Sequence, residues 1–292
     1  MNIVLENHSP LPFYDSLEEQ NHRKDYAFGV VYPLMTYKNM LMPFQVILDS
    51  ELFPDIDEVY LHNIETDEDI NIGQQMIEAG LSHKVYEDEI TKATCAIIKY
   101  PAIVPVTFIK QEGRYYIEII GGAGHSIFSE IFSVSSNVDN CLVLKYRNSY
   151  NLATPKGIID FSEGFMFSVL LQTQVGKPEY KFEEEATERM GYSFIESQVS
   201  KKVFKFTCII PEYLCDALRI VRLCNNKTIK SKGRNYTLST FSMDASWEVQ
   251  GDLASVECEF ETDTVIANIG DYKPVPLGGD FNASYNNSFN IE

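Results

Sequence analysis

Short runs in which apolar and polar residues alternate recur along most of the chain, and each predicts a β-strand. The clearest run covers residues 253–262, where Ala254, Val256, Cys258 and Phe260 alternate with Ser255, Glu257, Glu259 and Glu261. Since successive side chains of a strand point to opposite faces, this run predicts one buried row and one solvent-facing row. Further strands are predicted at residues 44–48, 58–62, 96–98, 107–110, 115–120, 128–134, 142–146, 165–171, 203–210, 236–241 and 245–249. The pattern as a whole predicts a mainly β protein.

One segment has helical rather than strand spacing. Its apolar residues recur at i, i+3, i+4 and i+7 and are Leu214, Ala217, Leu218 and Val221. This stripe, with Pro211 in the position that suits a first helical turn, predicts an amphipathic helix over residues 211–223 that packs on a sheet. A shorter helix is expected at residues 73–81.

Changes in pattern divide the chain into four predicted parts. Residues 1–42 are polar with isolated aromatic residues and predict an N-terminal arm. Residues 43–137 hold short strands with turn-rich stretches between them, which is typical of an immunoglobulin-like β-sandwich. Residues 138–269 predict a second β domain, a sandwich or barrel flanked by the helix, with a polar loop at residues 176–191. Residues 270–292 predict an extended C-terminal arm.

Composition and charge narrow the class of protein. The chain has 292 residues, enough for about two domains, and its 45% apolar and 23% charged residues are ordinary for packed cores. Lys and Arg number 24 against 42 Asp and Glu, so the net charge of −18 argues against tight nucleic-acid binding. The longest apolar runs fall short of the roughly 18 residues that a membrane span needs. The N-terminal residues do not resemble a secretory signal, so we expect synthesis in a cytoplasm.

The sequence offers no pattern for a cofactor, a metal or a catalytic site. Six cysteines lie without a CxxC pair and predict buried, reduced thiols. Residues 67–78 approach a calcium loop, but Ile72 stands where that loop needs glycine, which favours an acidic, solvated loop. The glycines before His125 precede a strand pattern, which favours a hairpin turn over a phosphate site. We therefore expect no cofactor and no enzymatic activity.

A column of carboxylates continues along the polar face of the last run, at Glu257, Glu259, Glu261 and Asp263. Like charges two residues apart on a strand lie roughly 7 Å from one another, which is mildly unfavourable unless water screens them. Three interpretations stay open. The face is a hydrated sheet surface, or it lines a channel that repels DNA, or it holds paired carboxylates for acid–base catalysis.

Five stretches of the chain carry a resemblance to a known family. They are YRNSYNL at residues 146–152, GKPEYKFEEE at 176–185, PEYLCDALRIVRL at 211–223, LASVECEFETD at 253–263 and, before these, GHSIFSEIFSV at 124–134. The chain resembles a family of virion structural proteins from tailed phages of Bacteroidetes, including crAss-like phages. The resemblance covers roughly residues 43–266, and its motifs are structural rather than catalytic. It implies a module like that of tail tubes and tail hubs at residues 138–269, with the loop at 176–191 reaching a neighbour.

The resemblance implies a structural subunit of a phage virion. Such subunits form rings of six or twelve copies around the DNA channel of the tail, tail hub or neck, and their partners are other copies and neighbouring virion proteins. The expected location is the virion, after synthesis in the cytoplasm of a bacterial host. Aromatic anchors dominate interface energetics, so we expect the arms to contact neighbouring subunits through Phe13, Tyr14, Tyr272, Phe281, Tyr285 and Phe289. The alternative is a receptor- or carbohydrate-binding module of a phage baseplate that uses the tyrosine-rich first domain.

Overall fold

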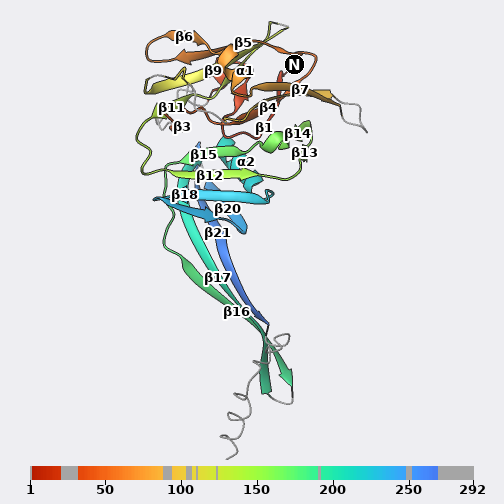
Figure 1. Ribbon diagram of the computed structural model, residues 1–292, viewed down its shortest axis with the longest axis vertical. Coiled ribbons are helices and arrows are strands. Elements are labelled where there is room, and N and C mark those ends of the chain that lie inside the picture. Colours follow the sequence, from red (N-terminus) through yellow and green to blue (C-terminus); the bar gives the residue numbers. More distant parts are fainter. Residues whose placement is uncertain are drawn as a thin grey trace, which may run out of the picture. The chain divides into compact units, whose positions relative to one another are not determined.

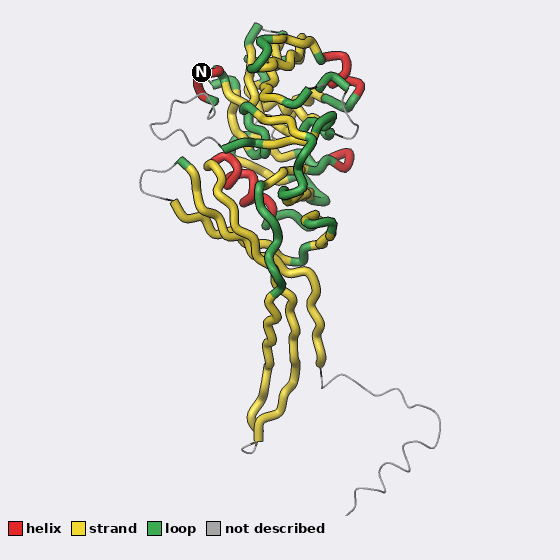
Figure 2. The backbone as a smooth tube through the Cα atoms, turned by 90° about the vertical axis from the view of Figure 1, so that its left-hand side faces the viewer, coloured by secondary structure: helices red, strands yellow, loops and turns green. Residues whose placement is uncertain are grey.

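The computed structural model describes residues 2–20, 32–87, 94–102, 107–109, 111–122, 124–189, 192–247 and 252–268. Strands make up most of this part of the chain, and short helices lie between them (Figure 2). The chain forms two compact units, which are Met1–Glu179 with Val203–Thr262, and Tyr180–Lys202 with Asp263–Glu292. The prediction of a mainly β protein is confirmed.

A four-stranded antiparallel sheet lies in the first unit. Its order is β1-β4-β8-β7, with β1 at Val4–Asn7, β4 at Phe44–Asp49, β8 at Thr94–Tyr100 and β7 at Ser82–Glu87. The central strand β4 is buried from Phe44 to Leu48, because its side chains are covered on both faces. A nearly continuous apolar run, rather than a strict alternation, is the pattern expected for such a strand.

A larger, eleven-stranded sheet also belongs to the first unit (Figure 1). Its main path is β19-β18-β12-β15-β3-β11-β9-β10-β2, and β5 pairs with β9 and with β6. The bounds are β2 Phe13–Tyr14, β3 Met35–Tyr37, β5 Ile56–Asn63, β6 Glu68–Asn71, β9 Gly113–Gly121, β10 Ser126–Ser129, β11 Phe132–Ser135, β12 Leu142–Arg147, β15 Phe167–Leu171, β18 Asn226–Ser231 and β19 Arg234–Thr237. Strand β3 is parallel to β11 and antiparallel to β15, so three residues join the two parts of this sheet.

Both predicted helices are present. Helix α2 (Glu212–Val221) buries the whole predicted stripe of Leu214, Ala217, Leu218 and Val221. It packs beside β12, where the hydroxyl of Tyr146 donates a hydrogen bond to the carbonyl of Ala217 at 3.2 Å. Helix α1 (Gly73–Glu78) is shorter and buries Met76.

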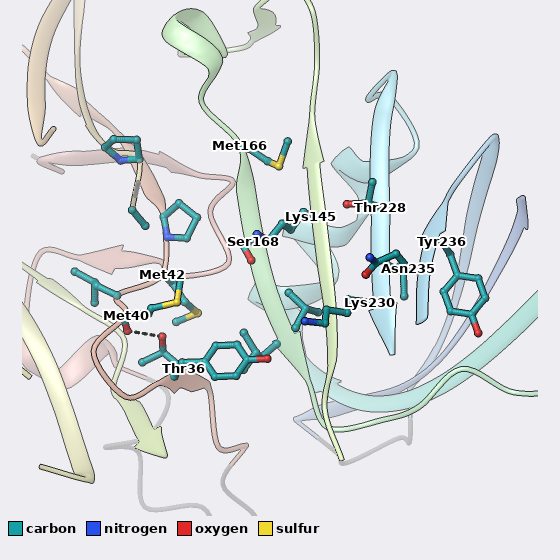
Figure 3. Close-up of a pocket in the computed structure, with 18 of the residues that line it drawn as sticks. Thr36, Met40, Met42, Lys145, Met166, Ser168, Thr228, Lys230, Asn235 and Tyr236 are labelled. Atoms are coloured by element: carbon teal, nitrogen blue, oxygen red, sulfur yellow. Dashed lines mark hydrogen bonds between the residues drawn. The ribbon is translucent and has the colours of Figure 1, made fainter. Parts of the chain in front are cut away.

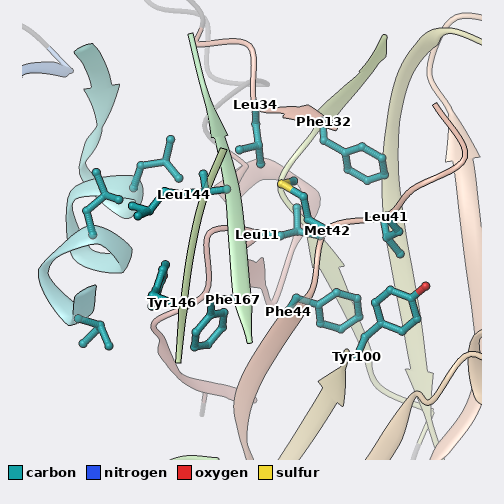
Figure 4. Close-up of a cluster of buried hydrophobic side chains, with 14 of the residues drawn as sticks. Leu11, Leu34, Leu41, Met42, Phe44, Tyr100, Phe132, Leu144, Tyr146 and Phe167 are labelled. Carbon is teal, nitrogen blue, oxygen red and sulfur yellow. The ribbon is translucent and has the colours of Figure 1, made fainter. Parts of the chain in front are cut away.

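One hydrophobic core joins strands from both sides of residue 137. Figure 4 shows Phe44 and Tyr100 on one side of this core and Tyr146 and Phe167 on the other. Because β3 and this core connect the two regions, the compact units of the structure do not divide at residue 137, where the sequence pattern placed a boundary. Residues 1–42, predicted to form an arm, contribute β1, β2 and β3 to the two sheets.

The remaining strands contribute to one or both units. They are β16 Glu179–Arg189, β17 Tyr192–Pro211, β20 Thr240–Trp247 and β21 Leu253–Asn268. Within the first unit β20 pairs antiparallel with β21, and the predicted inner row of β21 is fully buried. Within the second unit β16 pairs with β17. The loop predicted at residues 176–191 is therefore mostly a strand, which the alternation did not reveal because polar residues occupy both of its faces.

Two further strand predictions differ from the structure. The run at 128–134 is broken between β10 and β11, where the Ile131 amide donates a hydrogen bond to the Glu130 carboxylate at 2.9 Å. Residues 107–109 are not a strand, although Phe108 and Ile109 are buried. The described chain also holds a small hairpin and two 3-10 turns, which are β13 Leu152–Thr154, β14 Gly157–Ile159, η1 Leu17–Glu19 and η3 Ser162–Gly164.

Candidate functional site

Strand β16 of the second unit is exposed on both faces over residues 180–186. Every residue from 180 to 186 is exposed, with Phe182 at 74% and Tyr180 at 62%. A strand of a soluble domain normally buries at least one face, and a two-stranded hairpin without a buried face is marginally stable in water. The two aromatic side chains therefore have apolar area that no part of the described chain covers.

Polar pairs connect β16 to β17 along the same hairpin. Three consecutive glutamates take part, in the pairs Lys201 Nζ to Glu183 Oε1 at 2.7 Å, Gln198 Nε2 to Glu184 Oε1 at 2.9 Å and Ser197 Oγ to Glu185 Oε2 at 3.2 Å. These bonds orient the carboxylates along the hairpin. We call the exposed side chains of Tyr180 and Phe182 the hairpin aromatic surface.

The acidic column lies on the outward row of β21. Lys205 of β17 has its Nζ 3.0 Å from Glu257 Oε1 and 3.4 Å from Glu259 Oε2. The hydrogen bonds that Lys205 donates to these two carboxylates, that to Glu257 first, raise the pKa of Lys205 above its ordinary value. Glu261 is on the same row and half-buried, whereas Asp263 belongs to the second unit. Within the first unit the column thus consists of three carboxylates and one ammonium group.

The aromatic residues predicted to contact neighbouring subunits differ in their surroundings. Phe13 is fully buried in the core of its own chain, with its ring centroid 4.8 Å from that of Phe44, so it offers no surface to a neighbouring subunit. Tyr14 is half-buried, and its hydroxyl donates to Glu130 Oε2 at 3.2 Å. The four C-terminal candidates lie outside the described residues and are Tyr272, Phe281, Tyr285 and Phe289.

A buried ion pair lies where the smaller sheet meets the chain after β14. Lys99 Nζ is 2.6 Å from Asp160 Oδ2, and their side chains are 4% and 1% exposed. Burial raises the pKa of Asp160, but hydrogen bonds from Lys99 and Ser162 outweigh it and leave the pKa at about 2. Burial and the nearby Asp160 raise the pKa of Tyr86, which donates to the same carboxylate, to about 12. Each charge is satisfied by polar partners, so this cluster is suited to structure rather than to proton transfer.

In residues 67–78, whose sequence approaches that of a calcium loop, side chains form hydrogen bonds within the protein. Asp69 Oδ1 lies 2.6 Å from His62 Nδ1, and Glu118 Oε2 lies 3.0 Å from His62 Nε2. Asn71 accepts the amide hydrogen of Gly73 at 3.1 Å. The structure thus places His62 between two carboxylates, where it connects β6, β5 and β9.

A cavity of about 790 Å³ lies in the first unit. One wall is formed by β12, β15, β18 and β19, on the face of these strands opposite the one that packs against α2. The other wall includes residues 36–43 (Figure 3). Lys145 and Lys230 come from the sheet wall and Lys38 from the other wall. The sequence pattern did not single out this cavity, because its lining comes from segments about 200 residues apart that only the sheet order brings together.

Several general classes of site find no support in the described part of the chain. No group of three or more metal-ligating side chains is present there, and no helix in it is long and apolar enough to cross a membrane. The cysteines are free and all but Cys141 are buried, as predicted, and burial raises the pKa of the Cys224 thiol to about 12. No protein-family model and no curated protein matches the chain.

Proposed function

We propose that this protein is a structural subunit of a tailed-phage virion, which assembles into a ring in the tail, tail hub or neck through its hairpin aromatic surface. The observation that carries the proposal is the exposure of Tyr180 and Phe182 on a strand whose residues 180–186 are exposed on both faces. Large aromatic residues are enriched in protein interfaces and commonly supply most of the binding energy. A neighbouring subunit that covers them would remove apolar surface from water.

The edge of β16 supports the same proposal. In the described part of the chain β16 has β17 on one side and no strand on the other. An unpaired strand edge offers main-chain hydrogen bonds to another chain, and a closed ring removes such edges. The resemblance to virion proteins agrees with this mode of assembly, since it implies that residues 176–191 reach a neighbour.

The finer architecture and the channel belong to the proposal as well. Residues 43–137 contribute strands to two sheets, which agrees with an immunoglobulin-like sandwich, and residues 138–269 would form the tail-tube or hub-like module. The column of Glu257, Glu259, Glu261 and Asp263 would face the DNA channel. A net charge of −18 agrees with a channel wall that DNA passes without binding.

The experiment compares the mass of the full-length protein with that of a hairpin variant. Light scattering at several concentrations should find rings of six or twelve copies for the wild type, and a shift to smaller species for Tyr180→Ser/Phe182→Ser. A matched control is Tyr150→Ser/Leu223→Ser, because these residues are 64% and 58% exposed but lie in the first unit. If the hairpin variant assembles as the wild type does, or if the wild type is a monomer that stays monomeric beside other virion proteins, the proposal fails.

A specific observation favours the second candidate, a carbohydrate-binding module. On one face of β5 and β9 the rings of His62 and Tyr116 stack with centroids 4.4 Å apart, and Tyr60 and Glu118 lie next to them. Aromatic faces beside carboxylates provide both apolar and hydrogen-bonding contacts to a sugar. Binding on a glycan array that is lost in Tyr60→Ala/Tyr116→Ala, without ring formation by the wild type, would select this function instead.

A further inference from the structure

The cavity in the first unit has two rows of side chains on its sheet wall. In one row Lys145 of β12 lies opposite Ser168 of β15 and Thr228 of β18. In the next row Val143 lies opposite Leu170 and Lys230. Lys145 and Lys230 are therefore diagonal neighbours on adjacent antiparallel strands, a relation that sets their Cα atoms roughly 7–8 Å apart.

The lysines of the cavity differ from four lysines of the chain that are paired with carboxylates. Lys84, Lys99, Lys201 and Lys205 each have a carboxylate oxygen within 4.0 Å. In the described part of the chain no carboxylate oxygen lies within 4.0 Å of Lys145 or Lys230, and no acidic residue lines the cavity. Lys38 interacts electrostatically with Glu112, which lies outside the lining. The chain as a whole is acidic, with 42 acidic against 24 basic residues. The lining of the cavity is instead locally basic, because it holds three lysines and no carboxylate.

The rest of the lining is apolar and adaptable. Met40, Met42 and Met166 line the cavity together with Leu170 and Val143 (Figure 3). Methionine side chains are flexible and polarizable, and they recur in surfaces that accept varied peptide side chains. Hydroxyls of Ser168, Thr228 and Thr237 add hydrogen-bond partners beside the lysines.

We propose that this cavity binds an acidic, extended segment of a partner polypeptide. Its carboxylates would bind Lys145 and Lys230, whose separation suits one or two carboxylates between them, and its apolar side chains would contact the methionines. Charge complementarity argues for this occupant, because the site presents cations on both walls with apolar surface between them. A small inorganic anion would use the lysines but leave the methionines uncovered. This proposal does not depend on assembly through the hairpin.

The test measures binding of a fluorescein-labelled octapeptide of alternating glutamate and leucine to the full-length protein, by fluorescence anisotropy. We expect binding that weakens as salt rises, and at least about tenfold weaker binding of a matched glutamine and leucine peptide. Lys145→Gln/Lys230→Gln should weaken binding of the acidic peptide by about tenfold or more. Lys177→Gln/Lys232→Gln removes the same charge from exposed positions outside the cavity and should have little effect.

Four results would overturn the proposal, the last of them in a competition experiment. One is no binding of the acidic peptide at about 1 mM protein, and another is equal binding of the two peptides. The third is an unchanged affinity in Lys145→Gln/Lys230→Gln, with circular dichroism showing that the variant is folded. Inorganic phosphate serves as a competitor, and displacement of the peptide at phosphate concentrations below that of the peptide would assign the site to a small anion and so contradict the proposal.

Discussion

Aromatic side chains have opposite surroundings in the two units of this protein. In the first unit Tyr146 and Phe167 are fully buried, with ring centroids 5.3 Å apart. In the second unit Tyr180 and Phe182 also lie on a strand, yet both are largely exposed. Burial of apolar surface contributes about 25 cal/mol per Å², so the first pair stabilises the folded chain. The second pair gains the same contribution only when another surface covers it. The first pair therefore stabilises the fold, whereas the second pair is available to stabilise association.

The largest expected difference in the free energy of unfolding comes from replacing one phenylalanine in each unit by alanine. Phe167→Ala leaves a cavity in the core and should lower the free energy of unfolding by about 3–5 kcal/mol. Phe182→Ala removes an exposed ring and should change it by no more than about 0.5 kcal/mol. Urea denaturation followed by circular dichroism, at a concentration where the chain is monomeric, measures both. Equal losses in the two variants would mean that the hairpin ring contributes to the fold, contrary to the comparison.

The second effect concerns the buried pair of Lys99 and Asp160 and its dependence on pH. The pKa of Asp160 is about 2 in the folded chain, below the ordinary value of 3.8. The pair therefore stabilises the fold fully above pH 4, and this contribution is lost as the pH falls from about 4 to about 2. The advantage of the wild type over Asp160→Asn should shrink by roughly 1–2 kcal/mol over that interval.

Urea midpoints of both proteins between pH 2 and pH 6 give this difference, and comparison with the variant removes the effect of the other carboxylates. Asp55→Asn is a matched control, because the side chain of Asp55 is exposed and not part of the buried pair. A gap between wild type and Asp160→Asn that stays constant down to pH 2 would show that the carboxylate does not titrate as the geometry requires.

The smallest effect is expected at the exposed counterpart of that pair. Lys205 and Glu257 are separated by 3.0 Å, but both are exposed, so water and salt screen their attraction. Lys205→Gln should shift the urea midpoint slightly at low salt and not at all at high salt. A large loss of stability that does not depend on salt would mean that Lys205 stabilises the outward row of β21 through contacts other than its charge.

The local elements of this fold are readable from the sequence, but their pairing is not. The stripe from Leu214 to Val221 and the alternation from Ala254 to Phe260 are properties of neighbouring residues, and both predictions are confirmed. Strand β16 escaped prediction because residues 180–186 are exposed on both faces and polar residues break any alternation. The partition at residue 137 failed to mark a unit boundary because β3 pairs with strands that follow it by about a hundred residues or more.

The candidate sites depend even more on long-range pairing. Lys205 stands between Phe204 and Phe206, so its outward position is readable, but its carboxylate partners are on another strand. Likewise Lys99 and Asp160 are far apart in sequence, and no local pattern connects them. Of the arm residues, Phe13 shows that an isolated aromatic residue in a polar segment can belong to the core. The prediction for Tyr272 and the other C-terminal aromatic residues stays a prediction.

The short strand β3 also sets the order of events during synthesis. Met35 pairs with Ser133 and Leu170, so both partners leave the ribosome long after β3 itself. At translation rates of about 5–20 residues per second, the delay is on the order of ten seconds. Until then the segment cannot take its place between β11 and β15, and we expect it to be cleaved by proteases in ribosome-bound chains that end before β15. Strand β3, which joins the two parts of the large sheet, is thus synthesised early but pairs with its neighbouring strands late.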